Sequence, residues 1–219
     1  MLKRFVKRLL SCLLLAALFV LVVIGGTLGV QGWRLYRATA AQKPIAGLYD
    51  EISSRPGFAS CDQLPQTYID AVLSVEDSRF VHHHGVDPLS IARALWADLR
   101  SGTLAEGGST LTQQLAKNLF PRDTVRNRGA VVRKAKLVTS KFKEWITALK
   151  LEYNYTKEEI AAMYLNTVEF GSNAYGIKSA AHTFFNKEPH ELNIQEAALL
   201  AGLVKGCLLY TSDAADEAR

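Results

Sequence analysis

The sequence predicts an all-α domain preceded by one N-terminal transmembrane helix. Residues 9–30 form an apolar run without a charged side chain, which is long enough to cross a bilayer as a helix. Beyond residue 60, helix start signals and apolar residues at helical spacing recur, and no strand pattern of comparable strength competes. The 219 residues suffice for one such domain and its anchor.

The charges before the apolar run predict its orientation. Four basic residues precede it, namely Lys3, Arg4, Lys7 and Arg8. By the positive-inside rule, residues 1–8 stay in the cytoplasm and everything after Gln31 lies outside. The chain is therefore expected to be a single-pass protein of the inner, cytoplasmic membrane with a periplasmic or extracytoplasmic domain.

A cleaved signal peptide is the alternative interpretation of this N-terminus, with Ala38-Thr39-Ala40 as the cleavage site. However, the apolar run is longer than the hydrophobic region of a usual signal peptide. Arg34 and Arg37 also stand between the run and the alanines. These features favour the transmembrane anchor over residues 9–30.

Composition divides the rest of the chain into three segments. Residues 31–60 mix aromatic residues, prolines and small residues without clear periodicity, and are predicted to form a juxtamembrane stalk. Residues 61–206 form the predicted domain. Residues 207–219 break the helical pattern, and we expect them to be a non-native tail that follows a C-terminally truncated domain.

The predicted domain contains a series of helix start signals. Pro65 suits a first helical position, and Asp87-Pro88 combines an N-cap with proline at the start of a helix that runs to about Arg100. Later starts have the spacing of capping boxes, in which two side chains and two backbone amides bond reciprocally. These are Thr110-x-x-Gln113, Thr156-x-x-Glu159 and Asn193-x-x-Glu196.

Basic residues are concentrated in one part of the chain. The formal net charge is +5, and residues 117–150 contain ten Lys or Arg against Asp123 and Glu144. Basic surface near a membrane anchor fits anionic lipid headgroups, whereas nucleic acid would be on the wrong side of the membrane. A solvated surface face is the alternative interpretation of this run.

Cysteine and histidine predict neither a disulfide framework nor a metal site. Cys12 lies in the apolar run, Cys207 lies in the tail, and Cys61 has no obvious partner. The histidines at 82–84 are consecutive, and three adjacent side chains rarely converge on one ion. No metal ligand is therefore assigned.

Glu76 is the first candidate for acid–base chemistry. It shares a helical stripe with Ile69, Val72 and Leu73, so its carboxylate is expected to lose solvent. Desolvation raises the pKa of a carboxyl group, as a general base or acid near neutral pH requires. A structural role, such as pairing with Arg79, is the alternative.

Residues 107–119 predict an anion-binding helix start. The pair Gly107-Gly108 lets backbone N–H groups approach a phosphate, and Thr110, Gln114 and Lys117 follow on one helix face. Such a polar stripe can hold sugar hydroxyls and a diphosphate. The alternative is an ordinary amphipathic helix.

Lys141 and Glu144 stand three residues apart on a helix that also carries apolar residues. Taken alone, the pair is as well explained by a surface salt bridge, which contributes little stability.

The string Glu76-Asp77-x-x-Phe80-x-x-His83-x-Gly85 and residues 107–118 resemble the first two signature motifs of the peptidoglycan glycosyltransferases, glycosyltransferase family 51. These are the polymerising domains of class A penicillin-binding proteins and their monofunctional relatives. Residues 164–171 and 174–177 are similar to the fourth motif, where we expect Asn166 and Gly171 to be structural, and residues 192–203 are similar to the fifth. The resemblance implies a lysozyme-like fold.

The resemblance also implies roles for particular residues. Glu76 would be the catalytic base, and Glu144 would orient cations or help to hold a divalent ion, Mg²⁺ or Mn²⁺, on the substrate diphosphate. No cofactor is otherwise required. The implied substrate-binding residues are Asp77, Gly108, Ser109, Thr110, Gln113, Gln114, Lys117, Asn118 and Lys141.

The third motif departs from the family pattern Arg-Lys-x-x-Glu. Lys141 and Glu144 match it, but Ser140 stands where arginine is usual, which removes one cation expected near the leaving diphosphate. We expect compensation from a basic residue one or two turns earlier, for which Arg133, Lys134 and Lys136 are the candidates. Arg126 is a candidate for a further phosphate contact.

The implied reaction is polymerisation of lipid II into β-1,4 glycan strands with release of undecaprenyl diphosphate. The partners would be lipid II, the growing glycan chain and the membrane, while the sequence names no cell-wall partner protein. Two alternatives are a lysozyme-like enzyme that cleaves glycan with Glu76 and Glu144, and an inactive anchored remnant. No Lys-Thr-Gly triplet occurs, so this chain is expected to lack a penicillin-binding transpeptidase centre.

Overall fold

The computed structural model describes residues 2–101, 107–122 and 129–204. Its labelled helices are α1 (Leu2–Gln42), α2 (Leu48–Ser53), α3 (Gln66–Glu76), α4 (Pro88–Ser101), α5 (Leu111–Leu119), α6 (Ala130–Asn154), α7 (Lys157–Thr167) and α8 (Ile177–Phe185). A last helix covers Ile194–Val204. Within the described residues, strand-like pairing is confined to one isolated bridge between Glu169 and Tyr175, which confirms the all-α prediction.

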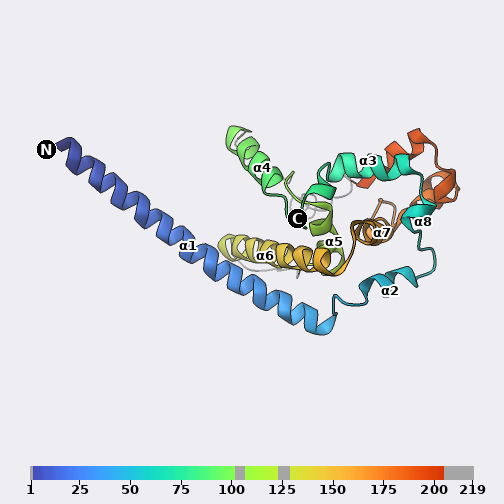
Figure 1. The fold of residues 1–219 in the computed structure, drawn as a ribbon, viewed down its shortest axis with the longest axis horizontal. Helices are drawn as coiled ribbons and strands as arrows, with labels where there is room; N and C mark the ends of the chain where they lie inside the picture. The colour runs from blue at the N-terminus through green and yellow to red at the C-terminus, as the bar shows by residue number, and fades with distance from the viewer. Residues whose placement is uncertain (1, 102–106, 123–128, 205–219) are drawn as a thin grey trace.

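Helix α1 is both a candidate membrane span and part of the domain. Its 41 residues extend about 60 Å at 1.5 Å per residue, twice the hydrocarbon thickness of a bilayer. The part over Lys7–Gln42 is apolar and long enough to cross a membrane. Figure 1 shows its N-terminal part leaving the body, while its C-terminal part runs along α6.

A glycine permits the close contact between α1 and α6. A Cβ atom built on Gly32 would lie 2.5 Å from Cβ of Phe142, whereas one built on Gly29 would meet nothing within 4 Å. The first part of segment 31–60, which was predicted to be a stalk, belongs to α1 and is helical as far as Gln42. The segment also contributes Ile45, Leu48 and Ile52 to the core, upstream of the domain start expected at residue 61.

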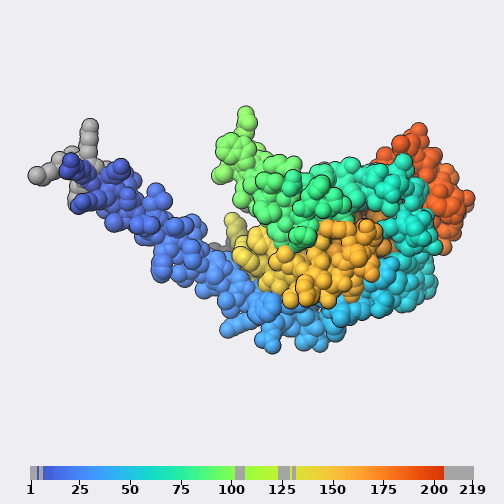
Figure 2. Space-filling view, viewed as in Figure 1, coloured from blue at the N-terminus to red at the C-terminus, as the bar shows by residue number. Residues whose placement is uncertain are grey.

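The core lies around α5 and α7. Leu111 and Leu115 of α5 pack with Ile160 and Met163 of α7, and all four side chains are buried. In Figure 1, α5 lies between α6 and α7, while α4 projects away from them. The free end of α4 also stands apart from the body in the space-filling view (Figure 2). Burial on several sides thus holds α5 rigidly.

The predicted helix starts are largely confirmed, although Pro65 is the N-cap of α3 and not its first helical residue. The boxes at Thr156 and Asn193 are both reciprocal. At Thr110 only half of the box forms: its Oγ1 accepts from the backbone N–H of Gln113, whose side chain donates to the carbonyl of Gly85 instead. The tail at 207–219, including Cys207, lies outside the described residues.

Candidate active site

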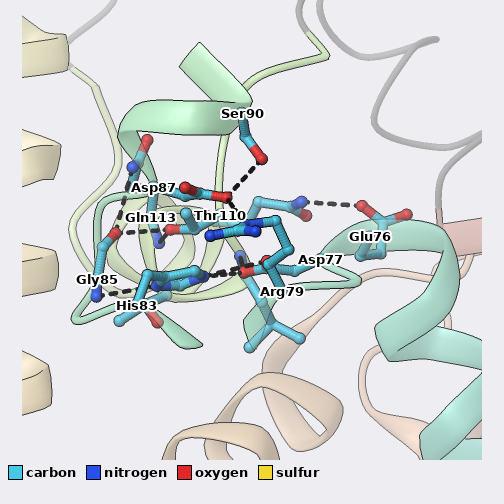
Figure 3. Close-up of polar contacts among 12 residues, drawn as sticks. Glu76, Asp77, Arg79, His83, Gly85, Asp87, Ser90, Thr110 and Gln113 are labelled. Carbon is cyan, nitrogen blue, oxygen red and sulfur yellow. Dashed lines mark hydrogen bonds and ion pairs between the residues drawn. The ribbon is translucent and has the colours of Figure 1, made fainter. Parts of the chain in front are cut away.

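The loop after α3 is fastened to the start of α5. The backbone N–H of Leu111 donates to Oδ2 of Asp77 at 2.9 Å, and Oγ1 of Thr110 donates to the carbonyl of Gly85 at 2.7 Å. His83 braces the loop internally, because its Nε2 lies 2.9 Å from Oδ2 of Asp77 while its Nδ1 accepts from the N–H of Gly85. Figure 3 shows these contacts converging beside Glu76. The two motifs therefore form one rigid unit.

The structure gives Asp77, Thr110, Gln113 and His83 a positioning role in this unit. Asp77, Thr110 and Gln113 are buried, and their printed hydrogen bonds hold the loop on α5. Among the described residues, no three His, Cys, Asp or Glu side chains are placed to hold a metal ion together.

Asp87 anchors α4 to the same unit. Its Oδ2 accepts from Nε of Arg79 at 2.9 Å and from Oγ of Ser90 at 2.7 Å. Burial raises the pKa of this carboxyl group, but the hydrogen bonds from Ser90, the backbone of Leu89 and Arg79 outweigh burial and lower the pKa to about 2. Arg79, which was considered above as a partner of Glu76, thus forms a salt bridge with Asp87.

Glu76 ends α3 and is half-buried. Nε2 of Gln114 donates to its Oε2 at 2.8 Å. The hydroxyl of Tyr164, from α7, donates in turn to Oε1 of Gln114 at 2.9 Å. The carboxylate is therefore held by a side chain of α5, which is itself held from beneath by α7.

A cationic cluster surrounds a second carboxylate. Glu144 is buried on α6, and its Oε1 lies 2.6 Å from Nε of Arg122, whose second nitrogen lies 3.2 Å from Oε2. Nζ of Lys141 lies 3.3 Å from the same Oε2 and donates to Oγ of Ser109 at 2.6 Å. Because both oxygens of Glu144 already receive cationic side chains, the residues present do not fit a resident divalent ion there.

Arg122 is the cation that the sequence did not single out. Lys143 of α6 donates to the carbonyls of Phe120 and Pro121, which fixes the chain just before Arg122. None of the expected substitutes Arg133, Lys134 and Lys136 lines the cavity, so that expectation is corrected. Arg126 lies outside the described residues.

One cavity of about 530 Å³ joins the two carboxylates. The predicted site residues that line it are Glu76, Gly108, Ser109, Gln113, Gln114, Lys117, Lys141 and Glu144, together with Arg122. A second cavity of about 320 Å³ adjoins Glu76 on another side and is lined in part by Asp77, Ser109 and Thr110. Asn118 lines neither cavity.

Helix α4 forms an apolar wall of the larger cavity. Ile91, Ala94 and Leu95 line the cavity, and a Cβ atom on Gly108 would lie 3.0 Å from Cβ of Ala94, so the glycine allows the wall to approach α5. Trp96 and Leu99 of the same helix are 70% and 82% exposed. The cavity thus has a polar, cationic floor and an apolar flank.

An all-α domain whose cleft places a carboxylate opposite fixed cations is consistent with a transferase that expels an anionic leaving group. The family model described as transglycosylase matches residues 43–219. The chain therefore belongs to the transglycosylase family, the glycosyltransferase family 51 domain with its lysozyme-like fold, as the motifs predicted.

Its relatives include penicillin-binding proteins. The chain is 37% identical over 182 residues to penicillin-binding protein 1A of Aquifex aeolicus and 40% identical over 167 residues to penicillin-binding protein 1F of Bacillus subtilis. These alignments cover 83% and 76% of this chain, but 24% and 21% of the relatives. The chain thus spans about a quarter or less of the length of these relatives.

Proposed function

We propose that the chain is a peptidoglycan glycosyltransferase that polymerises lipid II into β-1,4 glycan strands at the outer face of the cytoplasmic membrane. The observation that carries this proposal is the single cavity lined by Glu76 and by Lys117, Arg122 and Lys141. A base and a set of cations in one cleft are what attack by a sugar hydroxyl with loss of a diphosphate requires.

In the proposed reaction, Glu76 takes the proton of the acceptor's GlcNAc 4-hydroxyl. The oxygen attacks C1 of the MurNAc at the growing donor end, the bond to the diphosphate breaks, and undecaprenyl diphosphate leaves with inversion at C1. Lys117, Arg122 and Lys141 stabilise the negative charge that develops on the diphosphate. Glu144 holds two of these cations in place.

The apolar flank supports a lipid-linked substrate. Trp96 and Leu99 are largely exposed on α4, the helix that also lines the cavity. Exposed apolar side chains of this size suit an acyl environment or a partner surface more than water. In Figure 1, the free end of α4 and the N-terminal part of α1 extend toward the same side of the molecule.

Glycan cleavage by Glu76 and Glu144 is less well supported. A hydrolase of this kind needs its second carboxylate to act as a base or nucleophile. Both oxygens of Glu144 instead contact Arg122 or Lys141 at 2.6 to 3.3 Å, so cations occupy the positions from which this carboxylate would accept a water proton or attack the sugar. Cations in the cleft also have no leaving diphosphate to serve in that reaction.

The test is to incubate the purified chain with lipid II and, separately, with finished peptidoglycan. We expect glycan polymer from the first substrate and no soluble muropeptides from the second. Glu76→Gln should lower polymerisation at least about a hundredfold, the usual contribution of a general base, with an unchanged circular dichroism spectrum. Muropeptide release would support cleavage, and a folded wild-type chain without polymer would support an inactive binding module.

A further inference from the structure

Tyr164 has a polar atom whose role packing alone does not explain. Its side chain is wholly buried in α7. Burial, and then the nearby charge of Glu76 and the neighbouring Tyr68, raise the pKa of its hydroxyl well above the ordinary value. The hydroxyl therefore keeps its proton across the physiological range and remains available as a hydrogen-bond donor to Oε1 of Gln114 at 2.9 Å.

The donation by Tyr164 favours one orientation of the Gln114 amide. An amide oxygen only accepts hydrogen bonds and an amide nitrogen only donates them. With Oε1 of Gln114 receiving the tyrosine hydroxyl, Nε2 faces Oε2 of Glu76 at 2.8 Å. The opposite orientation would set an amide oxygen against the carboxylate. That arrangement is repulsive when Glu76 is ionised, and is favourable only when Glu76 carries a proton.

We infer that Tyr164 is a positioning residue: acting through Gln114, it keeps Glu76 ionised and oriented as the base of the proposed reaction. A hydrogen bond donated to the charged form of a carboxyl group favours that form. The inference rests on the proposed function for its kinetic consequence. Its electrostatic consequence, the ionisation of Glu76, is independent of any substrate.

The structure provides a matched control for removing the hydroxyl. Tyr68 is also a wholly buried tyrosine close to Tyr164, and its hydroxyl has no hydrogen-bond partner among the described residues. Tyr164→Phe and Tyr68→Phe each remove one buried oxygen and keep the ring. Only the first breaks the link to Gln114.

The kinetic experiment measures lipid II polymerisation against pH for both variants. We expect Tyr164→Phe to lower kcat about tenfold, with KM changed less than twofold and the acidic limb of the profile moved upward, because the base is less often ionised and oriented. Tyr68→Phe should remain within twofold of wild type. The other charged groups lining the two cavities beside Glu76 are unaltered in both variants: Asp77, Arg93, Asp98, Lys117, Arg122, Lys141 and Glu144.

A double-mutant cycle separates positioning from packing. If Tyr164 acts through Gln114, adding Tyr164→Phe to Gln114→Ala should have little further effect on kcat. Multiplicative losses, or an equal loss in Tyr68→Phe, would overturn the inference.

A substrate-free measurement keeps the inference testable whether or not the chain polymerises lipid II. The carboxyl carbon of Glu76, labelled with ¹³C and assigned by comparison with Glu76→Gln, can be titrated by NMR. Loss of a net hydrogen-bond contribution should raise its pKa by about half a unit or more in Tyr164→Phe. Tyr68→Phe should leave it unchanged. An unchanged pKa in Tyr164→Phe would overturn the inference, whereas absent polymer in wild type would count only against the proposed function.

Discussion

Glu144 organises the cationic end of the cleft at the scale of single residues. A buried carboxylate is costly unless cations and hydrogen bonds compensate its lost hydration. Here Arg122 and Lys141 do so, and the same contacts direct both side chains toward the cavity. Ser140 lies one helical turn before Glu144 on α6 and is buried, so an arginine there would point toward the same carboxylate.

Arg122 should therefore contribute strongly to the rate, and an arginine at position 140 should be able to replace it in part. We expect Arg122→Ala to lower the rate of lipid II polymerisation about tenfold to a hundredfold, because one charge opposite the leaving group is lost. Adding Ser140→Arg should restore part of that rate.

Arg133→Ala provides the control for Arg122, since Arg133 is exposed on α6 and lines neither cavity. Its initial rate should match wild type. Full activity of Arg122→Ala would remove Arg122 from the proposed mechanism.

At the scale of elements, one carboxylate fastens α4 to the loop after α3. The carboxylate of Asp87 accepts hydrogen bonds from the hydroxyl of Ser90 and the backbone N–H of Leu89, both in α4. It also accepts a hydrogen bond from the side chain of Arg79 in the loop. Because α4 forms the apolar wall of the cavity, the contacts of Asp87 determine where that wall stands.

Asp87 predicts a pH dependence of stability. Its pKa is lowered from 3.8 to about 2 in the folded chain, so its contribution is present above about pH 4 and is lost as pH falls through the folded value. That contribution is about 2 kcal/mol from the size of the shift. Urea unfolding of Asp87→Asn should show a lower free energy of unfolding at pH 7 and a smaller loss between pH 4 and pH 2. Exposed Asp70→Asn is the control, and equal slopes for wild type and Asp87→Asn would contradict the prediction.

The contact between α1 and α6 depends on the absence of a side chain. We expect Gly32→Ala to lower the midpoint of thermal unfolding in detergent by several degrees, because its Cβ atom would overlap Phe142. Gly29→Ala should leave the midpoint unchanged or slightly higher, since that position has open space and alanine favours helix. Equal midpoints for the two variants would show that α1 and α6 are not held at this distance.

At the scale of the whole molecule, the sequence predicted the features that depend on residues close together in the chain or on recognisable motifs. The helix class, the starts of α4 and α7, and the meeting of Glu76 with Lys117 and Lys141 in one cavity follow from periodicity, capping residues and motifs. Periodicity and capping depend on neighbours in sequence, and the motifs identified the family.

The features that sequence reasoning missed depend on contacts between distant segments. Arg122 follows a proline in a segment without periodicity, and its position is set by Lys143 from α6. Tyr164 opens the segment that is similar to the fourth motif, yet its hydroxyl gains a role only because α7 packs against α5. Residues 33–42 are helical although no periodicity marks them, because α6 provides the surface on which they pack.

The close packing of Gly32 against Phe142 has a mechanical consequence. Phe142 adjoins Lys141, so the candidate membrane helix abuts the backbone that bears one of the cations proposed to stabilise the leaving group. An apolar helix tilts when its length and the lipid thickness disagree. Such tilting would press on the floor of the cleft, so membrane thickness would be a physical input to the proposed glycan synthesis.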